Sequence, residues 1–121
     1  MQTLQVRKPA AAATLRRIPV CKEWDIPLGL GRAFEIAGRN IAVFKARDGV
    51  VFALAGICPH KNGPLADGMV VGHQVVCPLH AHRYEAHTGS CDQPNSCSIP
   101  AYPVEVDGDT VYVVLPVVGP A

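Results

Sequence analysis

The chain lacks the features that mark several large classes of protein. None of its apolar runs approaches the roughly 18 residues that a membrane-spanning helix needs, so we expect a soluble protein without a membrane anchor. Its formal net charge is only +1, which provides no electrostatic basis for binding nucleic acid. No secretory signal peptide is visible, and this absence favours a reducing, cytoplasmic location.

Two kinds of catalytic motif are absent as well. The sequence has no glycine fingerprint for a dinucleotide. Outside the motifs described below, it has no set of two histidines and a carboxylate of the kind that holds a mononuclear iron. We therefore expect that the chain does not catalyse a reaction alone.

Glycine and proline are abundant instead, with 11 of each among 121 residues. They separate short runs that are rich in Val, Ile, Tyr and Phe, and helix-period patterns are scarce. This composition predicts an all-β fold with many turns. One domain is expected at this length. We place it at residues 16–116, between mobile tails at 1–15 and 117–121.

The expected strands follow the β-rich runs between turn signals. Asp48-Gly49 and Gly108 mark hairpin turns, and Trp24 is expected to close one end of the core. The predicted strands are residues 17–21, 32–37, 40–46, 50–55, 69–72, 73–76, 83–86, 102–107 and 110–115.

Metal-binding residues are concentrated in two short motifs, Cys58-Pro59-His60 and Cys77-Pro78-Leu79-His80, which sixteen residues separate. Thiolates suit iron–sulfur clusters and zinc, and imidazole suits iron and zinc. A structural zinc site more often has a pair of cysteines followed by a pair of histidines. One ligand of each kind in each motif favours a 2Fe–2S cluster in which two cysteines hold one iron and two histidines hold the other.

The two motifs resemble the signature of the Rieske 2Fe–2S family, and the resemblance extends from Ile18 to Leu115. It implies an antiparallel β sandwich or barrel with two cluster-binding loops at one tip. Cys58 and Cys77 would bind the inner iron. His60 and His80 would bind the outer iron, at the solvent edge. The alternative from another class is a zinc-stabilised or metal-free interaction module.

The same resemblance assigns five residues to the surroundings of the cluster. Gly63 and Leu79 stand where high-potential Rieske proteins have two cysteines joined by a disulfide. His82 stands where those proteins have a serine that bonds a bridging sulfide. Tyr84 stands where a tyrosine donates its hydroxyl to a ligand sulfur, and core packing is its alternative role. Pro100 looks like part of the proline-bearing loop that covers a third side of the cluster.

These departures predict a low reduction potential. Without the disulfide and the serine, fewer groups stabilise the added negative charge of a reduced cluster. We expect a value in the low part of the Rieske range, which spans about −150 to +300 mV. Gly68, with Gly63, is expected to adopt backbone conformations denied to other residues and to turn its amide toward the cluster.

The remaining cysteines and two of the histidines lie outside the motifs. Cys21, Cys91 and Cys97 are expected to be free thiols, because the compartment is expected to be reducing. His73 and His87 are expected to be ordinary turn or surface histidines.

Within the Rieske proteins, the sequence most resembles the small subunit of assimilatory NAD(P)H-dependent nitrite reductase, over residues 41–54, 58–89 and 102–113. The resemblance implies an accessory subunit that transfers electrons for a large flavin and siroheme subunit, which reduces nitrite to ammonium. The ferredoxins of ring-hydroxylating dioxygenases share much of this pattern. Residues 81–84 depart from the Gly-Trp-x-Phe that is common in both groups. A ferredoxin that feeds such an oxygenase is the first alternative.

Overall fold

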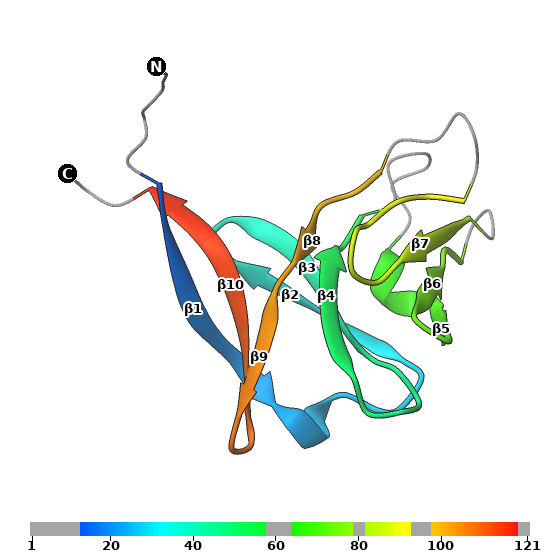
Figure 1. Cartoon of the computed structure of the whole chain (residues 1–121), viewed down its shortest axis with the longest axis horizontal. Helices are drawn as coiled ribbons and strands as arrows, with labels where there is room; N and C mark the ends of the chain where they lie inside the picture. The colour runs from blue at the N-terminus through cyan, green and yellow to red at the C-terminus, as the bar shows by residue number, and fades with distance from the viewer. Residues whose placement is uncertain (1–12, 58–63, 79–81, 93–97, 119–121) are drawn as a thin grey trace.

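The computed structural model describes residues 13–57, 64–78, 82–92 and 98–118. These residues form three antiparallel sheets, which confirms the expected all-β fold (Figure 1). Within them, no helix is long and apolar enough to cross a membrane.

The terminal sheet has the strand order β1 (Ala13–Lys22), β10 (Thr110–Val118) and β9 (Val104–Asp107). The central sheet has the order β2 (Gly31–Ile36), β3 (Arg39–Lys45), β4 (Val51–Ala55) and β8 (Ala101–Tyr102). The small sheet has the order β5 (Met69–Val71), β6 (Gln74–Val76) and β7 (Arg83–Glu85). Two short 3₁₀ helices, η3 (Glu23–Asp25) and η4 (Leu65–Asp67), lie between strands.

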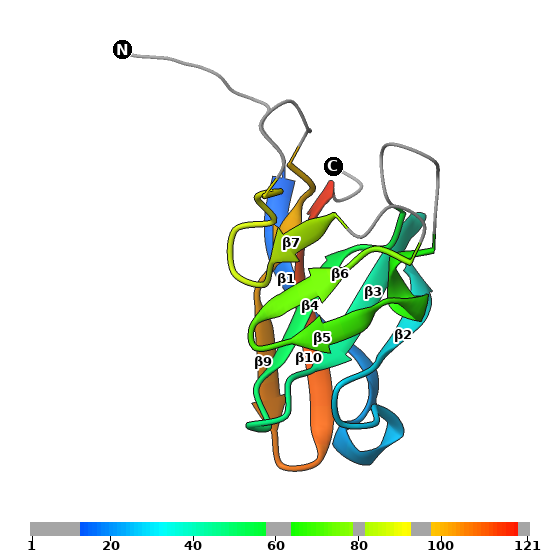
Figure 2. The ribbon, with the colours of Figure 1, turned by 90° about the vertical axis from the view of Figure 1, so that its right-hand side faces the viewer.

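The central sheet lies between the other two sheets and is buried on both faces (Figure 1). In β3, Ile41 and Val43 pack into a sandwich core with residues of β10. Their neighbours Ala42 and Phe44 point to the opposite face, because successive side chains of a strand alternate between its faces. There they meet the small sheet in a second core, here called the site core. Figure 2 looks onto the small sheet, with β3 and β4 behind it.

Pro103 divides the predicted strand 102–107 between two sheets. Before it, Tyr102 of β8 pairs with Ala53 of the central sheet. After it, Val104 of β9 pairs with Val113 of the terminal sheet. Proline has no N–H to donate to a ladder, so the chain leaves one sheet there and enters the other.

Two boundaries and one core residue differ from the sequence-based expectation. β1 begins at Ala13, which pairs with Val118 of β10, so both strands extend into the segments assigned to tails. The prediction that Trp24 closes one end of the core is wrong, because Trp24 is 64% exposed. Ile26 is buried instead. The Nζ of Lys45 lies 3.0 Å from the Glu23 carboxylate and 2.8 Å from the Glu23 carbonyl. Glu23 and Ile26 therefore anchor this turn.

Candidate metal centre

The first motif lies in a loop whose two ends are paired. Ile57, just after β4, forms an antiparallel bridge with Pro64, and the Leu65 amide donates to the Gly56 carbonyl at 2.8 Å. The chain therefore leaves the central sheet and returns to it at one place. Cys58, His60 and Gly63 lie between these paired ends, outside the described residues.

The second motif has a similar base in the small sheet. Val76 of β6 pairs with Arg83 of β7, and the Cys77 amide donates to the His82 carbonyl at 2.8 Å. Cys77 is thus the first residue after β6, held at the neck of a short loop. Leu79 and His80 lie outside the described residues.

Gly68 brings the two loop bases together. It follows η4, which follows the first motif, and a side-chain carbon at Gly68 would overlap the carbonyl oxygen of Val76. The residue leading into Cys77 therefore packs directly on the chain that leaves the first loop. The expected reason for this glycine is wrong, because its φ of −77° is open to any residue and its amide donates to the Leu65 carbonyl. Close approach of two backbones is what excludes a side chain here.

Cys77 is the predicted ligand that the structure places. Cys77 is 1% exposed and belongs to the site core, with Leu65, Val75 and Tyr84. The apolar residues of this core shield Cys77 from water. A thiolate buried at a strand end fits a cluster ligand, since coordination by a metal removes the cost of burying its charge.

Segment 98–100 links the supports of the two loops. The Ala55 amide at the end of β4 donates to the Pro100 carbonyl at 2.9 Å, and the Ile99 amide donates to the Gly89 carbonyl at 3.0 Å. Gly89 has φ +74°, and a side chain there would overlap the Ile99 carbonyl. Pro100 therefore lies between β4, which enters the first loop, and the turn after β7, which leaves the second. A covering role for Pro100 stays a prediction.

His82 and Tyr84 have different environments. His82 is half-buried, and its backbone carbonyl accepts a hydrogen bond from the Cys77 amide. Tyr84 is 0% exposed, pairs with Val75, and bridges to Cys91. Its ring thus fills the site core, whereas a bond from its hydroxyl to a ligand sulfur stays a prediction.

Two carboxylates organise the chain after the second motif, and the sequence reasoning did not find them. Asp92 Oδ1 accepts the Arg83 amide at 3.0 Å, and the Asp92 amide donates to the Arg83 carbonyl at 3.0 Å. Glu85 Oε1 accepts the amides of His87 and Thr88 and the Thr88 hydroxyl. Burial tends to raise the pKa of Glu85, but these hydrogen bonds outweigh it and lower the pKa below its ordinary value. Glu85 followed by Thr88-Gly89 was the available turn signal.

The other cysteines behave as expected where the structure describes them. Cys21 and Cys91 are free thiols, and Cys97 lies outside the described residues. Burial raises the pKa of the Cys21 thiol.

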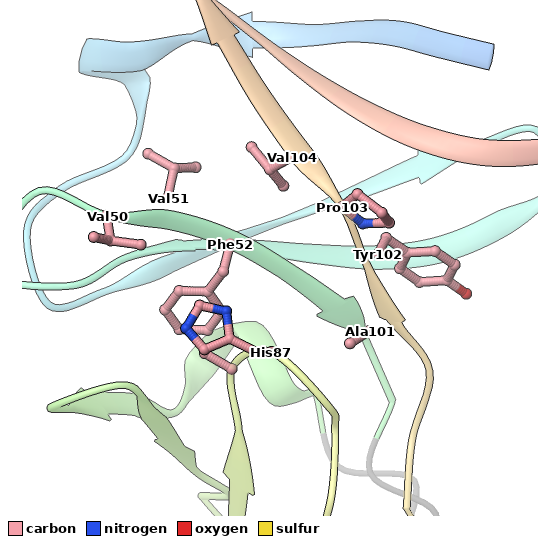
Figure 3. A pocket seen from close by; sticks show the side chains of 9 residues that line it. Val50, Val51, Phe52, His87, Ala101, Tyr102, Pro103 and Val104 are labelled. Carbon is pink, nitrogen blue, oxygen red and sulfur yellow. The ribbon is translucent and has the colours of Figure 1, made fainter. Parts of the chain in front are cut away.

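A cavity of about 480 Å³ lies between β4, the β8–β9 segment and the turn after β7. Phe52, His87, Val51 and Val104 are among the residues that line this cavity (Figure 3). Cys77 and Pro78, the motif residues that the structure describes, do not line it. Among the described residues, no group of three or more His, Cys, Asp or Glu side chains is placed to hold a metal ion. The candidate centre therefore consists of Cys77 with the three predicted ligands that lie outside the described ranges.

The antiparallel sheets and the paired Cys/His loops define the class of a small iron–sulfur protein. The family model described as "Rieske [2Fe-2S] domain" matches residues 16–103. The chain therefore belongs to the Rieske family, and a Rieske-type 2Fe–2S cluster is its cofactor. The resemblance and the cofactor inferred from the two motifs are confirmed.

Individual relatives come from two groups. The ferredoxin component of the naphthalene 1,2-dioxygenase system of Pseudomonas aeruginosa is 29% identical over 91 residues, covering 74% of this chain and 86% of the relative. The ferredoxin of carbazole 1,9a-dioxygenase from Nocardioides aromaticivorans is 28% identical, with a TM-score of 0.73, covering 80% of this chain and 95% of that one. A Mycobacterium tuberculosis protein described as an NADH-dependent nitrite reductase small subunit is 23% identical, with a TM-score of 0.75, covering 85% and 96%.

These matches establish a Rieske electron-transfer domain and its fold. At 23% identity, the nitrite reductase subunit supports the shared fold alone. The predicted nitrite reductase role is therefore supported only in its coarser part, which is electron transfer by a Rieske cluster.

Proposed function

We propose that this protein is a ferredoxin that carries single electrons to a Rieske-type oxygenase, such as a ring-hydroxylating dioxygenase. The observation that carries the proposal is the sequence identity: ferredoxin components of dioxygenases are 28–29% identical over 86% and 95% of their own length, whereas the nitrite reductase small subunit is 23% identical. When bound, the cluster supplies one electron at a time. The protein supplies its binding site, its potential and its docking surface.

The burial around Cys77 supports electron transfer through one side of the cluster. Cys77, Leu65 and Tyr84 are almost completely buried, so the protein core would cover the cluster on the side of Cys77. The opposite side would carry His60 and His80. An electron would then enter and leave along the histidine side, where a partner can approach most closely.

The second candidate is the predicted small subunit of an NAD(P)H-dependent nitrite reductase, bound to a large flavin and siroheme subunit. The observation in its favour is the sequence resemblance over residues 41–54, 58–89 and 102–113. In that role, the domain would be a permanent subunit, whereas a ferredoxin exchanges between partners.

Affinity purification under anaerobic conditions separates the two roles. For a ferredoxin, we expect a coloured protein that purifies without a stoichiometric partner and that an oxygenase component re-oxidises in stopped-flow mixing. Recovery of an equimolar protein that contains flavin and siroheme would contradict the ferredoxin role and support the nitrite reductase role. A colourless protein with one bound zinc would contradict both. Protein-film voltammetry should give a low Rieske potential, and a value above about +100 mV would contradict that expectation.

A further inference from the structure

Three turns meet at His73, at the strand ends opposite to the two motif loops. His73 lies between β5 and β6, Asp48 lies between β3 and β4, and His87 follows β7. His73 Nε2 lies 2.9 Å from Asp48 Oδ2. The Ala86 amide donates to the His73 carbonyl at 2.8 Å. The rings of His73 and His87 meet edge to face, with their centroids 5.6 Å apart.

This junction ties the hairpin that leads to Cys77 to the rest of the protein. β5, β6 and β7 are only three residues long, and such short strands are marginally stable without outside contacts. The Asp48–His73 contact connects the turn of this hairpin to the central sheet. In β5 of the same hairpin, the Val70 amide donates to the Gly29 carbonyl at 3.1 Å.

The charges around His73 have opposite effects on a protonated ring. Asp48, from the β3–β4 turn, attracts it. His87, from the turn after β7, would repel it when both rings are charged, and Glu85 lies in the same turn as His87. The remaining nearby charge is Arg47, whose guanidinium packs over Gly29.

A backbone hydrogen bond holds the Asp48 carboxylate in position for this contact. Its Oδ1 accepts the Val50 amide at 3.1 Å, which leaves Oδ2 for His73. The Val50 amide, followed by the His73 side chain, lowers the pKa of Asp48. Asp48 is therefore ionised at neutral and mildly acidic pH.

We propose that the Asp48–His73 contact is a pH-dependent latch that holds the β5–β6 hairpin against the central sheet and tightens when His73 is protonated. With a proton on His73, the contact is an ion pair, and without it the contact is a hydrogen bond. A tighter latch slows opening of the hairpin and hence loss of the cluster through Cys77. Protonation of His87 works against the latch.

The test is the rate at which excess chelator removes the cluster, followed by visible absorption from pH 8.5 to pH 5.5. The quantity to compare is the ratio of each variant's rate to the wild-type rate, in which titration of His60 and His80 cancels. His73→Phe keeps an aromatic ring but loses the contact with Asp48. Its ratio should rise about twofold to threefold as the pH falls, because only the wild type gains the ion pair. Asp48→Asn should show the same rise.

Two further variants make the test specific. His87→Gln removes the opposing charge, so its ratio should fall below one at the acidic end. Arg17→Gln breaks the exposed Arg17–Glu105 ion pair of the terminal sheet, whose N–O distance is also 2.9 Å, and its ratio should stay flat. Ratios for His73→Phe and Asp48→Asn that do not change with pH would overturn the proposal. An equal rise for Arg17→Gln would overturn it as well, because it would show general acid destabilisation.

Discussion

The terminal sheet and the small sheet are built in opposite ways. In the terminal sheet, β1 and β10 are 10 and 9 residues long and pair along almost their whole length. In the small sheet, each strand has three residues, and stability comes from the site core, from hydrogen-bonded turns and from a bound cluster. Both sheets pack on the central sheet, but the terminal sheet adds a long ladder of its own, whereas the sheet that carries Cys77 depends more on contacts with other parts of the chain.

Removal of the buried ligand should produce the largest difference in behaviour between the two sheets. We expect Cys77→Ser to abolish the Rieske visible spectrum and to lower the iron content to background, since the cluster loses a thiolate at a buried position. Amide hydrogen exchange should speed up in β5–β7 and stay slow in β1 and β10.

Cys21→Ser is the matched control for that loss. Cys21 is a half-buried free thiol in the terminal sheet, so its variant should keep a full cluster. If Cys77→Ser retained a normal spectrum, the assigned ligand set would be wrong.

Truncation of a core tyrosine should affect the small sheet more than the terminal sheet. Tyr84→Ala leaves a large cavity in the site core, where Tyr84 is 0% exposed, and should lower the free energy of unfolding by about 3 kcal/mol. Tyr112→Ala in β10 removes a half-buried ring that contacts Arg17 and should cost clearly less. Chemical denaturation measures both, and equal losses would contradict the assigned burial.

Gly68→Ala tests the contact between the two loop bases. The new methyl group would overlap the Val76 carbonyl, so we expect a loss of about 2 kcal/mol in unfolding free energy and faster loss of the cluster. Gly72→Ala is the control, because nothing lies within 4 Å of that position and the cost there comes from φ +59°. Gly72→Ala should therefore leave cluster retention closer to wild type than Gly68→Ala does.

The smallest expected effect concerns the turn after β7. The pKa of Glu85 is lowered in the folded protein, so its contribution to stability is complete above the ordinary value of 4.5 and is lost as the pH falls through the lowered value. Glu85→Gln should flatten the decline in unfolding free energy of the apo-protein below about pH 4.5. Thr88→Ala removes one of three donors and should flatten it less. An unchanged slope in Glu85→Gln would contradict the proposed role of this carboxylate.

Local patterns predicted most of the strands and the ligand set. Asp48-Gly49 and Gly108 marked their hairpins correctly, because turn chemistry depends on neighbouring residues. The motifs identified the cofactor for a similar reason, since the type and order of thiolates and imidazoles are written in a short stretch of chain.

Long-range packing explains the differences. No local pattern showed that Pro103 would divide a strand between two sheets, or that the turn anchored by Glu23 and Ile26 would leave Trp24 in solvent. Gly68 was recognised as special for the wrong reason, because the carbonyl that excludes a side chain there belongs to Val76 in another strand.

The sequence by itself determined the family, the all-β class and the four candidate ligands of the cluster, because each depends on residue type and spacing along the chain. Only the tertiary structure decided that Cys77 is sealed in a core shared with the central sheet. It also brought together Asp48, His73 and His87, which lie in three different turns. Contacts between distant segments depend on how the sheets stack, and no short stretch of the chain contains that information.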